Sequence, residues 1–278
     1  MSKNKHTKNT LSTLSVFSSY TKEVFSQKHY AKIHSVFPNG FNLDVDGELV
    51  YMSDHQEGML SARGVSIDKD VFDTISPQLK TGGHVRIKKD QLVFYTRPNV
   101  FTVNFTTQTV KELQVVPVTE EDLEAVDFLS HLKGMDLLEQ SGFSNNQMLM
   151  DILEDIQDTK DVKVNHVNQL IGAGVGLTPT GDDFLQGFML MEQTLDHLPH
   201  VQTIVEEQLK DRSTTEVSES YYEALFAGYS NEPLVLLFKA VLEQDANMFD
   251  EAISLIQQYG ETSGYDLLTG IVTYLQIL

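Results

Sequence analysis

The sequence GAGVGLTPTGDDFLQG, residues 172–187, decides how the rest of the chain is interpreted. Its first three glycines stand at alternate positions and supply positive φ angles, which let a backbone approach a ligand closely. Thr180 or Gly181 is expected to cap a helix, because Asp182 and Asp183 then fall in the first turn, where carboxylates suit the helix dipole. Apolar residues follow at helical spacing. The stretch therefore predicts a glycine loop that leads into a buried helix, with an anion site at its free N–H groups.

Two nucleotide-binding motifs are excluded at this loop. Gly176 and Gly181 have the spacing of a phosphate-binding P-loop, but Asp182 and Asp183 stand where that motif needs lysine and a hydroxyl residue. The dinucleotide fingerprint fails because Leu177 replaces its third glycine, and because the preceding segment has a helical pattern. A simple glycine-rich turn between two helices, with an acidic cap, stays open as the structural alternative.

Composition sets limits on the class of protein. The 278 residues include no cysteine, so the sequence predicts neither disulfides nor a thiolate site. The basic start, MSKNKHTKNT, lacks the apolar core of a secretory signal. No run approaches the ~18 consecutive apolar residues of a membrane helix. A soluble, cytoplasmic protein without a membrane partner is expected.

The net charge of −20 is spread unevenly along the chain. Residues 118–278 hold 6 of the Lys and Arg residues and 29 of the Asp and Glu residues. Such an acidic segment argues against binding of nucleic acid through phosphate neutralisation. An anionic substrate there must be held by local dipoles, by a metal ion or by a partner chain.

The hydrophobic pattern changes once and predicts an α+β protein. Residues 1–30 are expected to form a tail with a short helix, in which residues 1–10 are disordered and residues 11–25 are either helix or edge strand. Residues 31–117 alternate with period two between turn signals, which predicts a small antiparallel β barrel or sandwich, with a short helical insertion near residues 67–79. Residues 118–278 predict a mostly helical domain. Its expected helices cover residues 120–132, 145–159, 162–171, 181–197, 200–210, 214–228, 232–243, 247–258 and 264–277.

Two further helix starts in the acidic half are rich in hydroxyl or small residues. One follows Arg212 and the other follows Gly260. Helix N-termini with hydroxyls bind carboxylates or phosphates, although ordinary capping and turn chemistry explains the same pattern. Three such starts in one domain suggest that they converge on a shared anion. The candidate binding residues are Gly174, Gly176, Thr178, Thr180, Gly181, Arg212, Thr214, Thr215, Ser218, Ser263 and Gly264.

Asp182 and Asp183 are the candidate catalytic residues. Adjacent residues on a helix point about 100° apart, so the pair is not expected to hold one metal ion unaided. One carboxylate, with Asp182 preferred, is a possible Mg²⁺ ligand or an acceptor for a substrate amide, while the other caps the helix. The alternative is that both only serve the helix terminus. The chain has no G-x-S-x-G elbow and no cysteine, which argues against acyl-enzyme chemistry.

The run GVGLTPTGDDF, residues 174–184, resembles the signature of a bacterial family first catalogued as a domain of unknown function, which includes the AllH subunit of oxamate carbamoyltransferase. The family pattern reads G-x-G-L-T-P-S-G-D-D-x-L-x-G, so Thr180 replaces a serine. Residues 214–218 and GETSGYDLLTG, residues 260–270, also match. Glu261 stands where the family often has histidine, which puts a direct role of that position in doubt.

The resemblance implies a subunit of a multisubunit carbamoyltransferase in allantoin and purine breakdown. The implied reaction converts oxamate and carbamoyl phosphate to oxalurate and phosphate, with other subunits as partners. Two rival functions stay open: a non-catalytic assembly subunit, and a Mg²⁺-dependent phosphotransferase or hydrolase that uses Asp182. Ligand binding by the isolated chain distinguishes the first rival, and metal dependence distinguishes the second.

Overall fold

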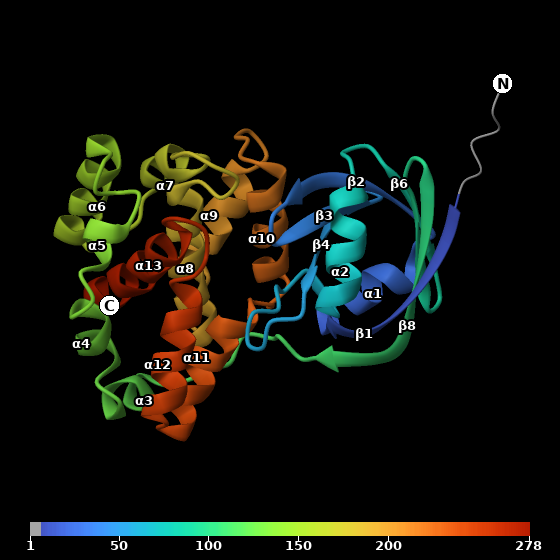
Figure 1. Ribbon diagram of the computed structural model, residues 1–278. Helices are drawn as coiled ribbons and strands as arrows, with labels where there is room; N and C mark the ends of the chain where they lie inside the picture. Colours follow the sequence, from blue (N-terminus) through green and yellow to red (C-terminus); the bar gives the residue numbers. More distant parts are fainter. Residues whose placement is uncertain (1–6) are drawn as a thin grey trace. The chain divides into compact units, whose positions relative to one another are not determined.

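The protein consists of two compact units, which meet in sequence at Leu113 and Gln114, in a computed structural model that describes residues 7–278 (Figure 1). In the described residues the first unit is a closed barrel of eight strands, confirming the barrel alternative. Its elements are β1 (Thr7–Ser18), α1 (Ser19–Gln27), β2 (Tyr30–Phe37), β3 (Gly40–Val45), β4 (Glu48–Asp54), β5 (Gly64–Ile67), α2 (Lys69–Ile75), the 3₁₀ turn η1 (Ser76–Gln78), β6 (His84–Lys88), β7 (Gln91–Tyr95) and β8 (Asn99–Lys111).

The barrel is mixed rather than fully antiparallel. The strand order is β1-β5-β4-β3-β2-β6-β7-β8, and β8 closes the sheet by pairing with β1 in parallel. The strands β4 and β5 also pair in parallel. Residues 55–63 return the chain across the barrel between them, which a tight hairpin turn cannot do. Period-two alternation shows which face of a strand is buried but carries no information on strand direction, so the antiparallel prediction was wrong for these two pairs.

Local turn chemistry sets the register of one hairpin. Asp46 and Gly47 join β3 to β4, and both have positive φ, +56° and +93°. Two left-handed residues in a two-residue loop match the right-handed twist of the flanking strands. Val45 therefore pairs with Glu48, and the alternating apolar residues of both strands face the interior. In the core of this unit, Phe41 stacks on Phe72 of α2 with ring centroids 6.1 Å apart.

The N-terminal segment is more ordered than the sequence predicted. Residues 1–6 of the expected disordered tail lie outside the described residues, and residues 7–10 begin β1. Residues 11–25, left as helix or strand, contain both: most of β1 and most of α1. Phe17 of β1 and Val24 of α1 are buried in the barrel core. The short helical insertion expected near residues 67–79 is present as α2 and η1.

The second unit is helical and begins with a capping box at Thr119 and Asp122, as expected. A positive φ at Asp127 (+49°) divides the single helix expected over residues 120–132 in two. The short α5 was not anticipated. The elements are α3 (Glu120–Ala125), α4 (Phe128–Lys133), α5 (Leu137–Gln140), α6 (Gln147–Thr159), α7 (Val164–Leu170), α8 (Thr180–Thr194), α9 (His200–Gln208), α10 (Glu216–Phe226), α11 (Glu232–Glu243), α12 (Ala246–Ile256) and α13 (Ser263–Ile277).

Helix α8 is the centre of this unit, since nearly all its residues are buried. It packs against α13 (Figure 1) through two glycines that let the backbones approach. A Cβ atom at Gly187 would lie 2.0 Å from the carbonyl oxygen of Leu267, and one at Gly270 would lie 2.1 Å from that of Phe184. Contacts this close exclude any side chain, so both positions require glycine. Among residues 7–278, none of the helices combines the length and the apolar character that crossing a membrane requires.

Candidate functional site

The loop between α7 and α8, residues 171–179, has the glycine-dependent shape that the sequence predicted. Gly172, Gly174 and Gly176 have φ angles of +70°, +126° and +99°, which side-chain-bearing residues rarely adopt. Gly174 also lies against the start of α8, where a Cβ would be 2.6 Å from the Thr180 nitrogen. Residues 174–177 are exposed, and Val175 retains 92% of its accessible surface. The loop is therefore held tightly at its base and open to solvent at its tip.

The N-cap of the helix after the loop lies one residue before Thr180 and two before Gly181, the two expected caps. Pro179 is the N-cap residue of α8, so Thr180 and Gly181 are already helical. A Cβ at Gly181 would lie 2.1 Å from the carbonyl oxygen of Leu170, at the end of α7. Gly181 thus serves close packing of the two helices. Thr180 is buried, in contact distance of Gly142, where a Cβ would lie 1.9 Å from the threonine hydroxyl.

The carboxylate of Asp182 connects the loop to other parts of the helical unit through hydrogen bonds. Its Oδ1 accepts hydrogen bonds from the N–H of Gly172 at 3.0 Å and from the hydroxyl of Tyr222 at 2.9 Å. Its Oδ2 accepts one from the hydroxyl of Thr214. The side chain is fully buried, and burial raises the pKa of Asp182, while the donors Thr214, Gly172 and Tyr222 lower it. Both oxygens are thus engaged by donors, a structural arrangement that sequence spacing gave no sign of.

The three helix starts singled out in the sequence converge on this loop. The Thr178 and Ser263 hydroxyls, 85 residues apart in sequence, are hydrogen-bonded at 2.7 Å, which brings the start of α13 to the loop. Thr215, the N-cap residue of α10, donates its hydroxyl to the carbonyl oxygen of Leu177. The same Thr215 oxygen accepts the N–H of Ser218 at 3.0 Å. The N-termini of α8, α10 and α13 therefore meet around residues 177–182, and we call this region the three-helix junction.

Asp183 differs from its neighbour because part of its carboxylate lacks a partner. It is 5% exposed, and its Oδ2 has no hydrogen bond. Burial raises the pKa of Asp183 well above its ordinary value, the charges of Asp266 and Asp182 raise it further, and the hydroxyls of Ser263 and Thr178 lower it. A buried carboxyl with an unpaired oxygen is costly unless it is protonated or meets a ligand. Asp183 is therefore a candidate at the junction for proton transfer or substrate hydrogen bonding.

Asp266, in the first turn of α13, is a second buried carboxyl at the junction. Its Oδ1 accepts the N–H of Gly142 at 2.7 Å, and its Oδ2 has no partner. Burial raises the pKa of Asp266, and the hydrogen bonds from Thr262, Gly142 and Thr180 lower it. The signal that was available is the repeated pattern of a small residue before a first-turn aspartate, shared by α8 and α13.

Several predicted binding residues lie away from the hydroxyl cluster or serve packing. Arg212 is exposed, and its Nε donates to the side-chain oxygen of Asn168 at 3.1 Å. A Cβ at Gly264 would lie 2.0 Å from the carbonyl oxygen of Ile256, so this glycine permits the turn between α12 and α13. Gly176 is exposed, with nothing within 4 Å of a Cβ there. Glu261 is exposed in the loop before α13.

The junction offers several hydrogen-bond donors to a ligand. In the described part of the chain, the N–H groups of residues 174–178 donate no hydrogen bond to another protein group. No cluster of three or more His, Cys, Asp or Glu side chains is arranged to hold a metal ion in residues 7–278. Both oxygens of Asp182 accept hydrogen bonds from protein donors, and its role as a Mg²⁺ ligand stays a prediction. What the junction supplies is an open row of N–H donors beside hydroxyls and a buried carboxyl.

Two family models match the chain. One is described as oxamate carbamoyltransferase subunit AllH and matches residues 170–275, which include the three-helix junction. The other is described as the AllH family N-terminal domain and matches residues 11–110, which include most of the barrel. No curated protein and no solved structure matches the chain.

Proposed function

Because the chain belongs to the AllH family, we propose that it is one subunit of an oxamate carbamoyltransferase, acting with other subunits on small anions. The reaction transfers the carbamoyl group of carbamoyl phosphate to oxamate, giving oxalurate and phosphate in allantoin breakdown in the cytoplasm. The main support for placing the active site at the three-helix junction is that the matched region contains the starts of α8, α10 and α13.

Carbamoyl transfer needs donors for the phosphate and for the carbamoyl oxygen, where negative charge develops. The free N–H groups of residues 174–178 and the paired hydroxyls of Thr178 and Ser263 provide such donors. The attacking nitrogen of oxamate must also be oriented and must lose a proton as the new C–N bond forms. Asp183 is suited to accept that proton, because its buried Oδ2 has no other partner.

The scarcity of cations in this half supports a requirement for partner subunits. Residues 118–278 hold six Lys and Arg residues, and Arg212, the one beside the junction hydroxyls in sequence, is directed to Asn168. Phosphate recognition in proteins usually includes arginine or lysine. We infer that a partner subunit supplies the missing positive charge.

A second candidate function is assembly without catalysis. It is favoured by the loop tip, where Val175 and Leu177 are 92% and 47% exposed. Exposed apolar side chains on a glycine-rich loop are suited to burial against another protein. In this alternative the junction only shapes the loop, and the chemistry belongs entirely to the partner.

The test is oxamate-dependent release of phosphate from carbamoyl phosphate, measured for this chain alone, for its co-encoded partner proteins alone, and for the reconstituted complex. We expect turnover only in the complex. Thr178→Val with Ser263→Ala should then lower kcat/KM while the complex still elutes intact. Unchanged kcat/KM in that double variant supports the assembly role, and turnover by the single chain contradicts the need for partners.

A further inference from the structure

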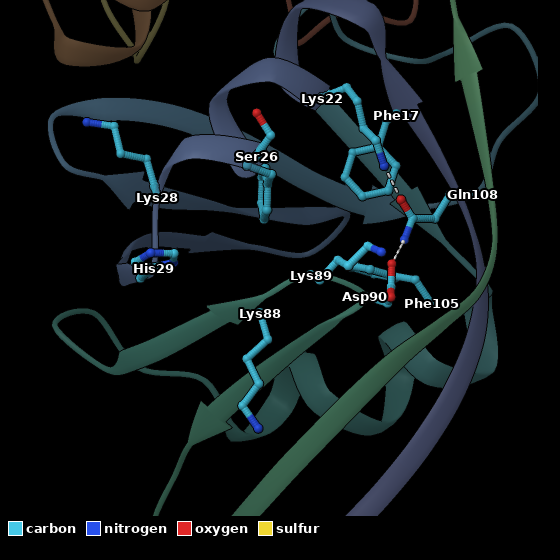
Figure 2. A pocket seen from close by; sticks show the side chains of 11 residues that line it. Phe17, Lys22, Ser26, Lys28, His29, Lys88, Lys89, Asp90, Phe105 and Gln108 are labelled. Carbon is cyan, nitrogen blue, oxygen red and sulfur yellow. Dashed lines mark hydrogen bonds between the residues drawn. The ribbon is translucent and has the colours of Figure 1, made fainter.

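The barrel unit contains a cavity of about 350 Å³, which we call the barrel pocket. Residues from β1, α1, the turn between β6 and β7, and β8 line it (Figure 2). This volume suits a ligand of metabolite size. All its lining residues belong to the first unit, whereas the three-helix junction belongs to the second.

One wall of the barrel pocket is aromatic. Phe17 and Phe105 are 2% and 7% exposed, and their rings meet edge to face with centroids 5.4 Å apart. Phe25 packs against Phe17 in the same manner at 5.8 Å. Phe17 and Phe105 thus support the partly exposed ring of Phe25, which gives the cavity an apolar surface. Such a surface favours a flat apolar group in a ligand.

The rim of the barrel pocket is basic. Four lysines and a histidine line it, against a single carboxylate, that of Asp90. The amide of Gln108 engages that carboxylate at 3.1 Å and, through its oxygen, accepts a hydrogen bond from Lys22. Lys28 is paired with Asp46 at 3.5 Å. The lysines at the rim are Lys22, Lys28, Lys88 and Lys89.

Three of these lysines have no acidic partner in the described residues, and Lys88 donates to the amide oxygen of Gln91. Among the described side chains, neither Lys22 nor Lys89 has a carboxylate within 4.0 Å. The Lys22 ammonium lies 4.7 Å from the centre of the Phe17 ring, so it joins the basic rim to the aromatic wall. Figure 2 shows Lys22 and Lys89 on the side of the cavity where Gln108 and Asp90 lie. An unpaired cation next to an apolar wall binds anions more strongly than one in open water, because the local dielectric is lower.

We propose that the barrel pocket binds a small molecule that joins a flat apolar group to an anionic group. The apolar group packs on Phe25, the partly exposed ring of the aromatic wall, and the anion lies beside Lys22 and Lys89. Phosphates and carboxylates both satisfy this chemistry. The proposal does not depend on the carbamoyltransferase assignment, since it rests on the barrel alone.

Calorimetric titration of the full chain tests this with four probes: 1-naphthyl phosphate, 1-naphthoate, inorganic phosphate and 1-naphthol. We expect one saturable site, with Kd for a ring-bearing anion at least tenfold below the Kd of inorganic phosphate or of 1-naphthol. Whichever of the two ring-bearing anions binds more tightly identifies the preferred anionic group. Affinity should fall as salt is raised, because the ion pairs are screened.

Variants locate the site. Lys89→Gln and Lys22→Gln should each raise Kd about tenfold, as expected for loss of one charge-assisted hydrogen bond. Lys80→Gln is the matched control, because Lys80 is exposed in the same unit and does not line the pocket. Lys89 is exposed, so its replacement keeps the test valid even if the Lys22 variant unfolds. No saturable binding by either ring-bearing anion, or an equal loss in the control, would overturn the proposal.

Discussion

The hydroxyl of Tyr222, on α10, donates a 2.9 Å hydrogen bond to Oδ1 of Asp182, on α8. Both side chains are fully buried, and they join two of the three helices that meet at the junction. With the donors from Gly172 and Thr214, this bond gives Asp182 the role of an internal anchor. Its neighbour Asp183 has an unpaired oxygen instead. The two adjacent carboxylates, similar in sequence, are thus expected to behave differently on substitution.

Asp182→Asn is expected to destabilise the protein by about 1–3 kcal/mol. The amide NH₂ would meet donors where the carboxylate now accepts hydrogen bonds, and at least one of them would lose its partner. Urea denaturation followed by circular dichroism gives the free energy of unfolding. Asp250→Asn is the matched control, because Asp250 is exposed on α12 and its replacement should change stability very little. Equal stability of the two variants would contradict the anchoring role.

Stability is expected to rise as the pH falls through the raised folded-state pKa values of two buried aspartates toward their unfolded-state value. Burial raises the folded-state pKa values of Asp183 and Asp266 above the unfolded value of about 3.9. The folded protein then binds more protons than the unfolded chain over the window between these values. The stability that Asp183 and Asp266 contribute is fully present below their unfolded-state pKa. It is lost as the pH rises through their raised folded-state pKa values.

The melting temperature as a function of pH measures this contribution. The double variant Asp183→Asn, Asp266→Asn should show a shallower slope between pH 5 and pH 8 than the wild type, because its amides do not titrate. Comparing the slopes of the two proteins removes the effect of general charge repulsion, because the wild type has a net charge of −20 and the double variant has nearly the same charge. Identical slopes would show that these two carboxyls do not titrate in that window.

Gly187→Ala is expected to destabilise the helical unit by about 1–3 kcal/mol or more. Its Cβ would lie 2.0 Å from the Leu267 carbonyl oxygen, so α8 and α13 must separate. Gly134→Ala is the control, since Gly134 has right-handed φ and its Cβ would make an ordinary 3.5 Å contact. That control should be neutral or gain about 0.4–1 kcal/mol. Thermal unfolding that ranks the two variants in the opposite order would contradict the close-packed α8–α13 contact.

The sequence predicted the helices well because each carries a strong local signal. The Thr119–Asp122 capping box and the 3.6-residue period from Glu232 to Glu243 act within one or two turns. The two parallel strand pairings depend on how the barrel closes, which local alternation does not encode. The four-residue strand β5 is also too short to show a clear period.

Only those parts of the candidate site that carry a local sequence signal were predicted. The glycine loop, the hydroxyl-rich helix starts and Asp183 are visible as local motifs. Tyr222 and Asp266 were missed as junction residues because they reach Asp182 and Gly142 over 40 and 124 positions. The sequence does not show that Asp182 accepts hydrogen bonds at both oxygens whereas Asp183 has one oxygen without a partner. That distinction depends on which donors the tertiary fold brings near.

The central claim is that the three-helix junction takes part in carbamoyl transfer, and Asp183→Asn in the reconstituted complex tests it most directly. The measurement is kcat/KM for oxamate-dependent phosphate release, with melting temperature as the folding control and Asp250→Asn as the matched variant. Loss of one positioned proton acceptor predicts a fall of about a hundredfold or more, with the melting temperature unchanged or higher. A kcat/KM within a few-fold of wild type in an intact Asp183→Asn complex would contradict the claim.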